Sequence, residues 1–349
     1  MKKIFLYAYD HVNLGDDLFI ETIVNRYPDT EFYFWTDNEN KKVFQEQMNL
    51  KIIDQDSGKI KLLNKIRPSL VARYKVGIQK KCDAQVYIGG SIFMEYPTWK
   101  NIVSWWDYQS KLLPFFVLGA NFGPYHTEEY RSEMDKVYAK LSDICFRDTY
   151  SKKLFKDNEN VRQAPDILFS YQMPKIPKKK KQIFVSIISC EHRNLKGLTE
   201  EEYIIKMSHL INEFCREKYQ IILASFCEEE GDLLVAKKIK NHIKDASNIE
   251  ILSYDGQNRK NFLERMSESS YIIATRFHEI PVYPVIYSDK TKNVLEDIHF
   301  KGNYADLRDS RTLTYESAKD NLIANYVVDV DKLKKDSSQH FMKLDKILK

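Results

Sequence analysis

Short apolar runs recur along the first half of this chain, and several end in a glycine or a charged residue where a loop can begin. The runs cover residues 4–9, 31–35, 85–88, 114–118 and 143–146. Between the first two, residues 17–27 carry apolar side chains at the spacing of a helix. Alternation of strands and helices is typical of a parallel sheet wrapped by helices, so we predict an α/β fold.

The alternation is interrupted at residues 173–182, which hold two prolines and four consecutive lysines. Such residues do not fit the interior of a sheet, so the segment is predicted to be a linker. The alternation then resumes with strands at 183–188, 220–224, 249–252 and 271–274, and with a helix opened by a Thr199/Glu202 capping box. A chain of 349 residues is long enough for two domains. We predict two α/β domains at 1–172 and 183–325, a cleft between them, and a basic helical tail at 326–349.

Composition narrows the class of protein further. The 54 basic and 50 acidic side chains give a formal charge of only +4, which does not favour nucleic acid as a partner. Five widely spaced cysteines without a Cys-x-x-Cys motif favour neither a disulfide framework nor a zinc site. No apolar run approaches the ~20 residues of a membrane span. We therefore expect a soluble cytoplasmic protein without a metal, whose lysine run at 178–181 and C-terminal lysines are solvated and contact an anionic membrane at most weakly.

Two basic clusters follow predicted strands of the second domain. Arg276 and His278 come directly after strand 271–274, and Lys290 lies a short distance beyond them. His192 and Arg193 follow strand 183–188. Arginine offers a fixed fork of donors and histidine can transfer a proton, and the carboxyl edge of an α/β sheet is where such folds bind ligands. The pattern predicts a site for a small, multiply charged anion.

The first domain has a different motif between its first strand and first helix, Asn13-Leu-Gly15-Asp16-Asp17. Either aspartate can cap the helix, and the helix N-terminus offers free backbone N–H groups. The motif is neither Gly-x-Gly-x-x-Gly nor a P-loop, so it indicates neither a dinucleotide nor a nucleoside triphosphate. Helix capping alone and ligand binding both remain open for it.

Three further loops of the first domain are predicted to lie along one edge of its sheet. They contain Gly90, Asn121 and Arg147, each directly after a predicted strand. Glycines there let a ligand or another backbone segment approach closely. The alternative is that these loops only turn the chain and that Arg147 pairs with Asp148.

Taken in order, these motifs resemble those of the polysaccharide pyruvyl transferases. The resemblance runs from residue 4 to about residue 300 and rests on Asn13-x-Gly15-Asp16, Gly89-Gly90, Gly119-x-Asn121-x-Gly123-Pro124, Arg147-Asp148-x-x-Ser151, Pro165-Asp166, Arg276-x-His278 and Tyr287-x-x-Lys290. It implies two Rossmann-like domains arranged as in GT-B glycosyltransferases. It also implies transfer of pyruvate from phosphoenolpyruvate, the donor substrate, to a sugar as a cyclic ketal during synthesis of a cell-surface polysaccharide, without a cofactor.

The resemblance also suggests roles for single residues. Arg276 and His278 match the family element that holds phosphoenolpyruvate, and Arg193 is the candidate for a further arginine of that site. His278 is the candidate general acid and Asp16 the candidate base, because ketal formation needs both. Lys290, Asn13, Gly15, Gly90, Asn121 and Arg147 are the remaining candidates for substrate binding.

One departure from the family pattern keeps other functions open. Family members have an apolar helix after Arg-x-His, but here Glu279-Ile280 passes at once into the apolar run 281–286, so about one mean helix length is missing. One alternative is a GT-B glycosyltransferase that uses a nucleotide sugar. Another is a catalytically impaired member that serves as a binding or scaffold protein in envelope synthesis.

Overall fold

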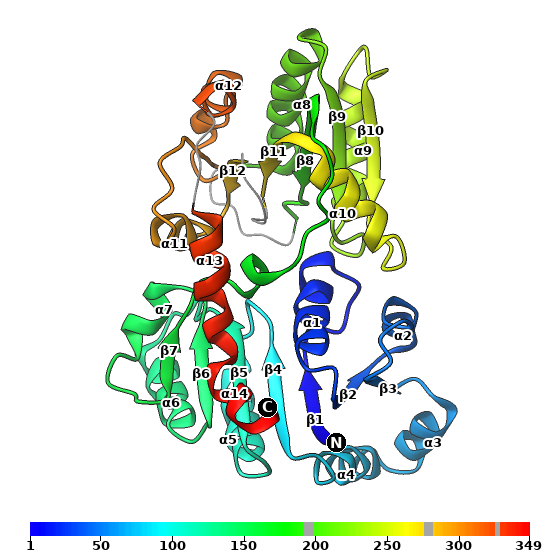
Figure 1. Cartoon of the computed structure of the whole chain (residues 1–349), viewed down its shortest axis with the longest axis vertical. Coiled ribbons are helices and arrows are strands. Elements are labelled where there is room, and N and C mark those ends of the chain that lie inside the picture. Colours follow the sequence, from blue (N-terminus) through cyan, green and yellow to red (C-terminus); the bar gives the residue numbers. More distant parts are fainter. Residues whose placement is uncertain (192–197, 276–281, 325–328) are drawn as a thin grey trace. The chain divides into compact units, whose positions relative to one another are not determined.

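The computed structural model describes residues 1–191, 198–275, 282–324 and 329–349. Its contacts divide the chain into two compact units. The first consists of Met1–His11, Asp16–Tyr171 and Val330–Lys349, and the second of Val12–Gly15 and Gln172–Asp329. Figure 1 shows that each unit is built around a sheet of its own.

The first unit contains a seven-stranded parallel sheet in the order β3-β2-β1-β4-β5-β6-β7. Its strands are β1 (Lys2–Tyr7), β2 (Thr30–Thr36), β3 (Leu50–Asp54), β4 (Ala84–Ile88), β5 (Phe115–Ala120), β6 (Asp143–Phe146) and β7 (Val161–Gln163). Its helices are α1 (Leu14–Arg26, whose first two residues count with the second unit), α2 (Asn38–Val43), α3 (Gly58–Ile66), α4 (Pro68–Gln79), α5 (Trp99–Ser110), α6 (Glu128–Tyr138), α7 (Thr149–Leu154) and the 3-10 turn η1 (Ile167–Ser170).

Aromatic side chains fill much of this unit's core. Trp106 stacks on Phe115 with ring centroids 5.1 Å apart, and Phe122 stacks on Tyr130 at 5.5 Å. All four rings are buried. Rings of this size contribute large apolar areas, so they fix how α5 and α6 lie on the sheet.

No element between β2 and β4 was predicted from the sequence. The chain reaches the edge strand β3 and returns to β4 through two helices, α3 and α4. Pro68 lies at the first position of α4 and Arg67 is extended (φ −165°), as expected for a residue before proline. This junction turns one basic stretch into two successive helices rather than one long helix.

The second unit contains a six-stranded parallel sheet in the order β10-β9-β8-β11-β12-β13, counted over the residues described. Its strands are β8 (Lys179–Ile187), β9 (Gln220–Ser225), β10 (Ile249–Ser253), β11 (Ser269–Ala274), β12 (Val282–Ile286) and β13 (Ala305–Asp306). Its helices are α8 (Glu200–Arg216), α9 (Asp232–His242), α10 (Arg259–Glu268), α11 (Asp289–Asp297), α12 (Tyr315–Ala324) and the 3-10 turn η2 (Ser310–Thr312).

Two sequence predictions for this unit can be compared with the structure directly. The capping box of α8 is confirmed, because Thr199 and Glu202 bond reciprocally to each other's backbone N–H. The linker is shorter than predicted, because β8 already begins at Lys179 and includes three lysines of the run. Lys179, Lys180 and Lys181 are exposed there, so they lengthen the strand without entering the core.

The segment after Asp329 returns to the first unit. It forms α13 (Val330–Ser337), the 3-10 turn η3 (Ser338–Phe341) and α14 (Met342–Leu348), so the predicted tail helix is interrupted. Asp345 of α14 accepts two hydrogen bonds from Arg26 (3.1 and 2.6 Å) and one from Tyr27 (2.7 Å).

A second set of contacts fixes η3 of the same segment. Arg162 binds the buried Asp143 through two hydrogen bonds (2.8 and 2.7 Å) and also donates to the carbonyl oxygens of Gln339 and His340. The ring of His340 lies 2.9 Å from the carbonyl oxygen of Pro165. These contacts make the segment a structural part of the first unit.

The structure also describes the cysteines and the apolar character of the helices. All five cysteines are unpaired thiols and buried. Among the helices of the described residues, none combines the length and apolar character that crossing a bilayer requires.

Candidate functional site

Four strand ends of the first unit bring the predicted motif residues together. Gly90 follows β4, Asn121 follows β5, Arg147 follows β6 and Asp166 follows β7. Because these strands are parallel, their carboxyl ends share one edge of the sheet. The edge is therefore built from residues that the sequence analysis selected one loop at a time.

Arg147 is the centre of this edge. Its Nη1 donates to Asp166 Oδ2 at 3.0 Å, and its Nη2 donates to Asn121 Oδ1 at 2.8 Å. The guanidinium lies so close to Gly90 that a Cβ there would be 2.8 Å from Nη1. A side chain at position 90 would therefore have to displace the guanidinium of Arg147.

The predicted alternative of an Arg147–Asp148 pair is wrong. Asp148 instead caps α7, since its Oδ1 accepts from Ser151 N at 2.7 Å and its Oδ2 from Ser151 Oγ at 2.9 Å. Ser151 Oγ in turn accepts from the backbone N–H of Phe122 at 2.8 Å. The Arg-Asp-x-x-Ser motif thus joins the loops after β5 and β6.

The motif at the start of α1 also differs in detail from the prediction. The helix begins at Leu14, so Asp16 and Asp17 lie in its first turn rather than at its cap. The cap is supplied by Asn13, whose Oδ1 accepts from Gly15 N at 3.0 Å. The two carboxylates still suit a helix N-terminus, because its dipole favours negative charge.

Asp16 lies near a group that the sequence analysis did not select. Burial, followed by the negative charges of Asp10 and Asp16, raises the pKa of Tyr87 to about 12. Burial lowers the pKa of Lys75 to about 8, although attraction to Asp10 opposes this change. The Lys75 ammonium lies 5.2 Å from the ring centroids of both Tyr7 and Trp35. The carboxyl end of β1 thus combines carboxylates, aromatic rings and an amine.

In the second unit, Arg193, Arg276 and His278 lie outside the described residues, but the strands that lead to them are described. These strands, β8 and β11, are direct neighbours in the sheet. Ser186 and Thr275, at their carboxyl ends, share a hydrogen bond of 2.8 Å between their hydroxyl oxygens. Thr275 directly precedes Arg276, so the segment with Arg-x-His starts from a fixed point.

The segment that leads to Arg193 also starts from a fixed point. The backbone N–H of Ser189 donates to Asp232 Oδ1 at 2.9 Å, and the hydroxyl of Ser189 donates to Glu200 Oε2 at 2.9 Å. Burial alone would raise the pKa of Glu200, but hydrogen bonds from Lys238 and Ser189 outweigh it and hold that pKa below its usual value. Both carboxylates therefore serve to anchor the strand end.

Lys290 lies in the first turn of α11, directly after β12. It thus belongs to the same carboxyl edge of the second sheet as the ends of β8 and β11. Of the three predicted cationic residues for substrate in this unit, it is the one within the described residues.

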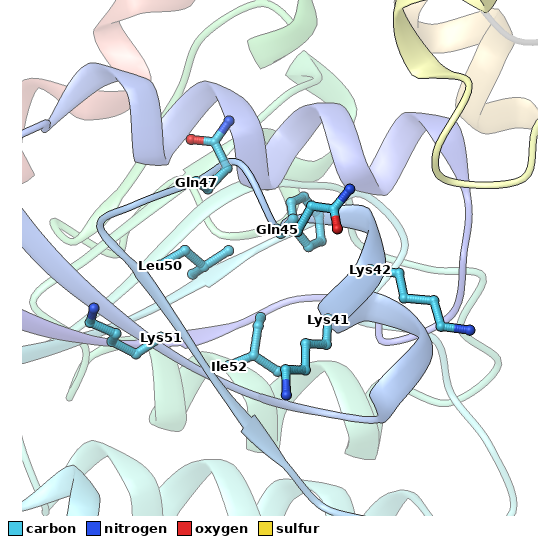
Figure 2. Close-up of a pocket in the computed structure, with 8 residues that line it drawn as sticks. Lys41, Lys42, Gln45, Gln47, Leu50, Lys51 and Ile52 are labelled. Atoms are coloured by element: carbon cyan, nitrogen blue, oxygen red, sulfur yellow. The ribbon is translucent and has the colours of Figure 1, made fainter.

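A separate basic pocket of about 520 Å³ lies beside the edge strand β3. Lys41, Lys42 and Lys51 contribute to its lining. Figure 2 shows their ammonium groups pointing in different directions rather than toward a common point. A small anion with several charges needs convergent donors, so this pocket is not the candidate site.

Comparison with protein families decides the classification. The family model for polysaccharide pyruvyl transferase matches residues 13–278, which is more than half of the chain. The chain belongs to this family. A pyruvyl transferase family member is a transferase, and the matched region includes every predicted site residue except Lys290. No curated protein matches the sequence.

Solved structures similar to this pyruvyl transferase family member confirm the predicted fold class. MnaA from S. aureus, solved with UDP, has a TM-score of 0.60 and 15% identity over 99% of this chain and 95% of its own. A putative UDP-N-acetylglucosamine 2-epimerase from Listeria monocytogenes has a TM-score of 0.57 and 11% identity over 99% and 95%. HepE from Anabaena, solved with UDP and glucose, has a TM-score of 0.55 and 13% identity over 99% and 100%. At these identities the likeness shows two parallel-sheet α/β domains of the GT-B type and nothing finer.

Some residues near the candidate site had no signal in the sequence. Asp10, Lys75 and Tyr87 are separated along the chain and belong to no motif, yet the charge of Asp10 acts on the pKa values of both Lys75 and Tyr87 in the folded protein. Asp166 did have a signal, because Pro165-Asp166 is part of the family pattern. Its partner Arg147 became clear only from the structure.

Proposed function

We propose that this protein transfers pyruvate from phosphoenolpyruvate to a sugar and forms a cyclic ketal. The observation that supports this most is the family match over residues 13–278, which includes Arg276 and His278. A carboxylate and a phosphate on one small donor suit guanidinium groups, which bind such anions through two parallel hydrogen bonds.

The donor is assigned to the second unit. Arg193 follows β8 and Arg276 follows the neighbouring strand β11, and the ends of these strands are held by Ser186, Thr275 and Ser189. We propose that both arginines bind phosphoenolpyruvate and that Lys290 adds a third positive charge.

The reaction needs an acid and a base. In the proposed sequence His278 donates a proton to C3 of the enol while a sugar hydroxyl oxygen bonds to C2 and loses its proton to a base. The C–O bond to phosphate then breaks and inorganic phosphate leaves with the proton that the base took up, and a second hydroxyl oxygen bonds to C2 while its proton returns to His278. Asp16 is the proposed base.

The acceptor is assigned to the first unit. Asp16 lies there, and its charge and that of Asp10 both act on the partly buried Tyr87. Carboxylates accept hydrogen bonds from sugar hydroxyl groups, and aromatic rings present an apolar face to a sugar ring. We propose a glycan of the cell-surface polysaccharide as acceptor, free or carried on a lipid at the cytoplasmic face of the membrane.

A second candidate is a glycosyltransferase that uses a nucleotide sugar. It is favoured by the similar solved structures, two of which contain UDP and one of these also glucose. A catalytically impaired binding protein is the third candidate, because the apolar run 281–286 follows His278 almost at once.

Thermal unfolding of the purified protein separates the three candidates. If phosphoenolpyruvate is the donor, we expect phosphoenolpyruvate to raise the melting temperature, since a ligand at 100 times its Kd stabilises by about 2.7 kcal/mol. UDP-glucose and UDP-N-acetylglucosamine should then leave the melting temperature unchanged. Release of inorganic phosphate from phosphoenolpyruvate with a glycan acceptor then tests turnover. Stabilisation by a UDP-sugar instead establishes the second candidate, and no stabilisation by either ligand establishes the third.

A further inference from the structure

The helices α3 and α4 carry a concentrated positive charge. Residues 57–82 contain eight basic side chains and no acidic one; they are Lys59, Lys61, Lys65, Arg67, Arg73, Lys75, Lys80 and Lys81. Without them the chain has 46 basic against 50 acidic residues, so the remainder is net acidic. A cationic segment on an otherwise acidic protein needs a specific explanation.

Most of this charge faces solvent. All eight cations except Lys75 are exposed. Lys61 pairs with Asp56 at 3.5 Å, and Lys59 lies 4.3 Å from the ring centroid of Tyr74. Lys65, Arg67 and Arg73 form no ion pair or side-chain hydrogen bond with any residue that the structure describes. Their charge is therefore open to an anionic partner.

Apolar side chains lie exposed among these cations. Leu62 is 59% exposed and Ile66 is 65% exposed. They are four residues apart on α3 and share one face of the helix, and Lys61 and Lys65 form a parallel row beside them. Ile60 of the same helix is buried, so α3 is attached to the unit by another face. Exposed aliphatic groups bordered by lysines are the pattern of a helix that lies in a membrane interface.

The two helices are fixed to the first unit. Tyr74 of α4 packs on Trp35 of β2, with ring centroids 6.3 Å apart, and Gln79 is fully buried at the end of α4. The Nε2 atom of Gln79 donates to Tyr7 Oη at 2.6 Å and to Gln109 Oε1 at 2.8 Å. The basic surface is thus presented by a folded element and not by a tail.

We propose that the exposed face of α3 and the α3–α4 junction dock on a bilayer of anionic phospholipid. Lys65, Arg67 and Arg73 meet the lipid phosphates, while Leu62 and Ile66 enter the boundary between headgroups and acyl chains. This goes beyond the proposed pyruvyl transfer and does not depend on it. Such docking would bring the protein to the surface at which a lipid-carried acceptor is located.

Other lysines that the sequence suggested for membrane contact are less suitable. Lys179 pairs with Glu268 at 2.9 Å, and Lys181 donates to the carbonyl oxygen of Glu217 at 2.9 Å. In the C-terminal segment, Lys349 lies 3.4 Å from Asp345. Acidic or carbonyl oxygens of the protein already neutralise or bind these groups.

Co-sedimentation with vesicles tests the docking surface on the full chain. The protein binds vesicles that contain phosphatidylglycerol and not vesicles of phosphatidylcholine alone. Each basic residue near such a surface strengthens binding about fivefold, so the variant Lys65→Gln/Arg67→Gln/Arg73→Gln binds at least about tenfold more weakly. The variant Leu62→Ser/Ile66→Ser also binds about fivefold or more weakly, and its defect persists in high salt, because salt screens only the charges.

A matched control uses three exposed lysines of the same unit, Lys152, Lys153 and Lys156. Their replacement by glutamine removes the same charge and leaves vesicle binding within about twofold. The proposal is overturned if the unaltered protein does not bind phosphatidylglycerol vesicles, or if the control variant loses as much binding as the α3–α4 variant. Normal circular dichroism and melting temperature of every variant exclude misfolding, since all substituted side chains are exposed.

Discussion

The two sheets use the carboxyl ends of their strands in different ways. In the first unit, charged and polar motif residues bind one another, with Arg147 held between Asp166 and Asn121. In the second unit, hydroxyl groups and carboxylates hold the strand ends, as at Ser186 and Ser189, and the arginines come after these points. The motif residues of the two units therefore have different roles. Those of the first unit hold the loops at the strand ends together, whereas those of the second unit include the arginines that we propose to bind the donor.

This difference predicts that substitutions in the two units have their effects in different assays. Changes in the second set should alter donor binding or turnover in a protein of normal stability. Changes in the first set should alter the free energy of unfolding and leave the affinity for the donor unchanged.

The largest effect is expected at His278. Replacement by alanine lowers the turnover of phosphate release by ~10²–10⁴-fold, the contribution of a positioned acid, and leaves the melting temperature unchanged. Arg276→Ala instead weakens phosphoenolpyruvate binding by about 1.5–3 kcal/mol in calorimetry. His209, an exposed histidine of α8, is the control, and His209→Ala retains full turnover. Normal turnover of His278→Ala would remove the proposed acid.

A comparable effect, now on stability, is expected from Asp143→Ala in the first unit. Asp143 is fully buried and binds Arg162, whose side chain is only 14% exposed. Removing the carboxylate leaves a buried guanidinium without its counter-charge, so urea unfolding shows a loss of about 3–5 kcal/mol. Asp107 binds Lys111 and Lys140 at the surface, so Asp107→Ala costs less than about 1 kcal/mol. A change in donor affinity with Asp143→Ala would break the comparison.

His340 gives the first unit a pH dependence. Burial lowers its pKa from 6.5 to about 4. The unfolded chain therefore binds a proton in this range while the folded protein does not, and the free energy of unfolding falls as the pH falls from 6.5 to about 4. The slope is about 1.4 kcal/mol per pH unit.

Urea unfolding between about pH 7 and about pH 5 measures that slope. His340→Gln keeps a hydrogen-bond donor for the carbonyl oxygen of Pro165 and does not titrate. The variant should lose this part of the slope, while the carboxylates contribute equally to both proteins. Equal slopes for the two proteins would show that His340 is protonated in both states or in neither.

The smallest effect is expected at Gly90. The Cβ of Gly90→Ala meets Arg147 Nη1 at 2.8 Å, and two hydrogen bonds prevent the guanidinium from moving freely. Such overpacking costs about 1–3 kcal/mol. Gly77 of α4 is the matched control, because its added Cβ meets nothing within 4 Å. Gly77→Ala should stabilise by about 0.5–1 kcal/mol, since alanine favours a helix interior. An effect of Gly90→Ala on donor affinity alone would reverse the roles of the two edges.

The sequence predicted the alternation well because strand and helix periods are local properties. The strand at 143–146 matches β6 residue for residue, and most others differ by one to three residues at an end. It did not reveal β3, α3 and α4, because the stretch from 50 to 79 mixes apolar residues with lysines and has no glycine-ended apolar run. In residues 50–79, the side chains that pack into the core are determined by tertiary contacts of the folded unit.

The candidate site was predictable only as a set of loops. Parallel strands bring their carboxyl ends to one edge, so Gly90, Asn121 and Arg147 could be placed together without coordinates. Which residues pair could not be predicted, because Asp148 is next to Arg147 in the sequence while Asp166 is its partner in the structure. The lowered pKa of Lys75 could not be predicted either, since it arises from burial in the folded unit.

The return of Val330–Lys349 to the first unit has a consequence for how the protein is made. A ribosome that has translated as far as Asp329 has produced every part of the second unit, but the first unit still lacks Asp345 and the backbone that Arg162 binds. The unit that begins synthesis first is therefore completed last. Until then, the surface of α1 that receives α14 is open to chaperones and proteases, and the native contacts close it only after the whole of this sequence has been translated.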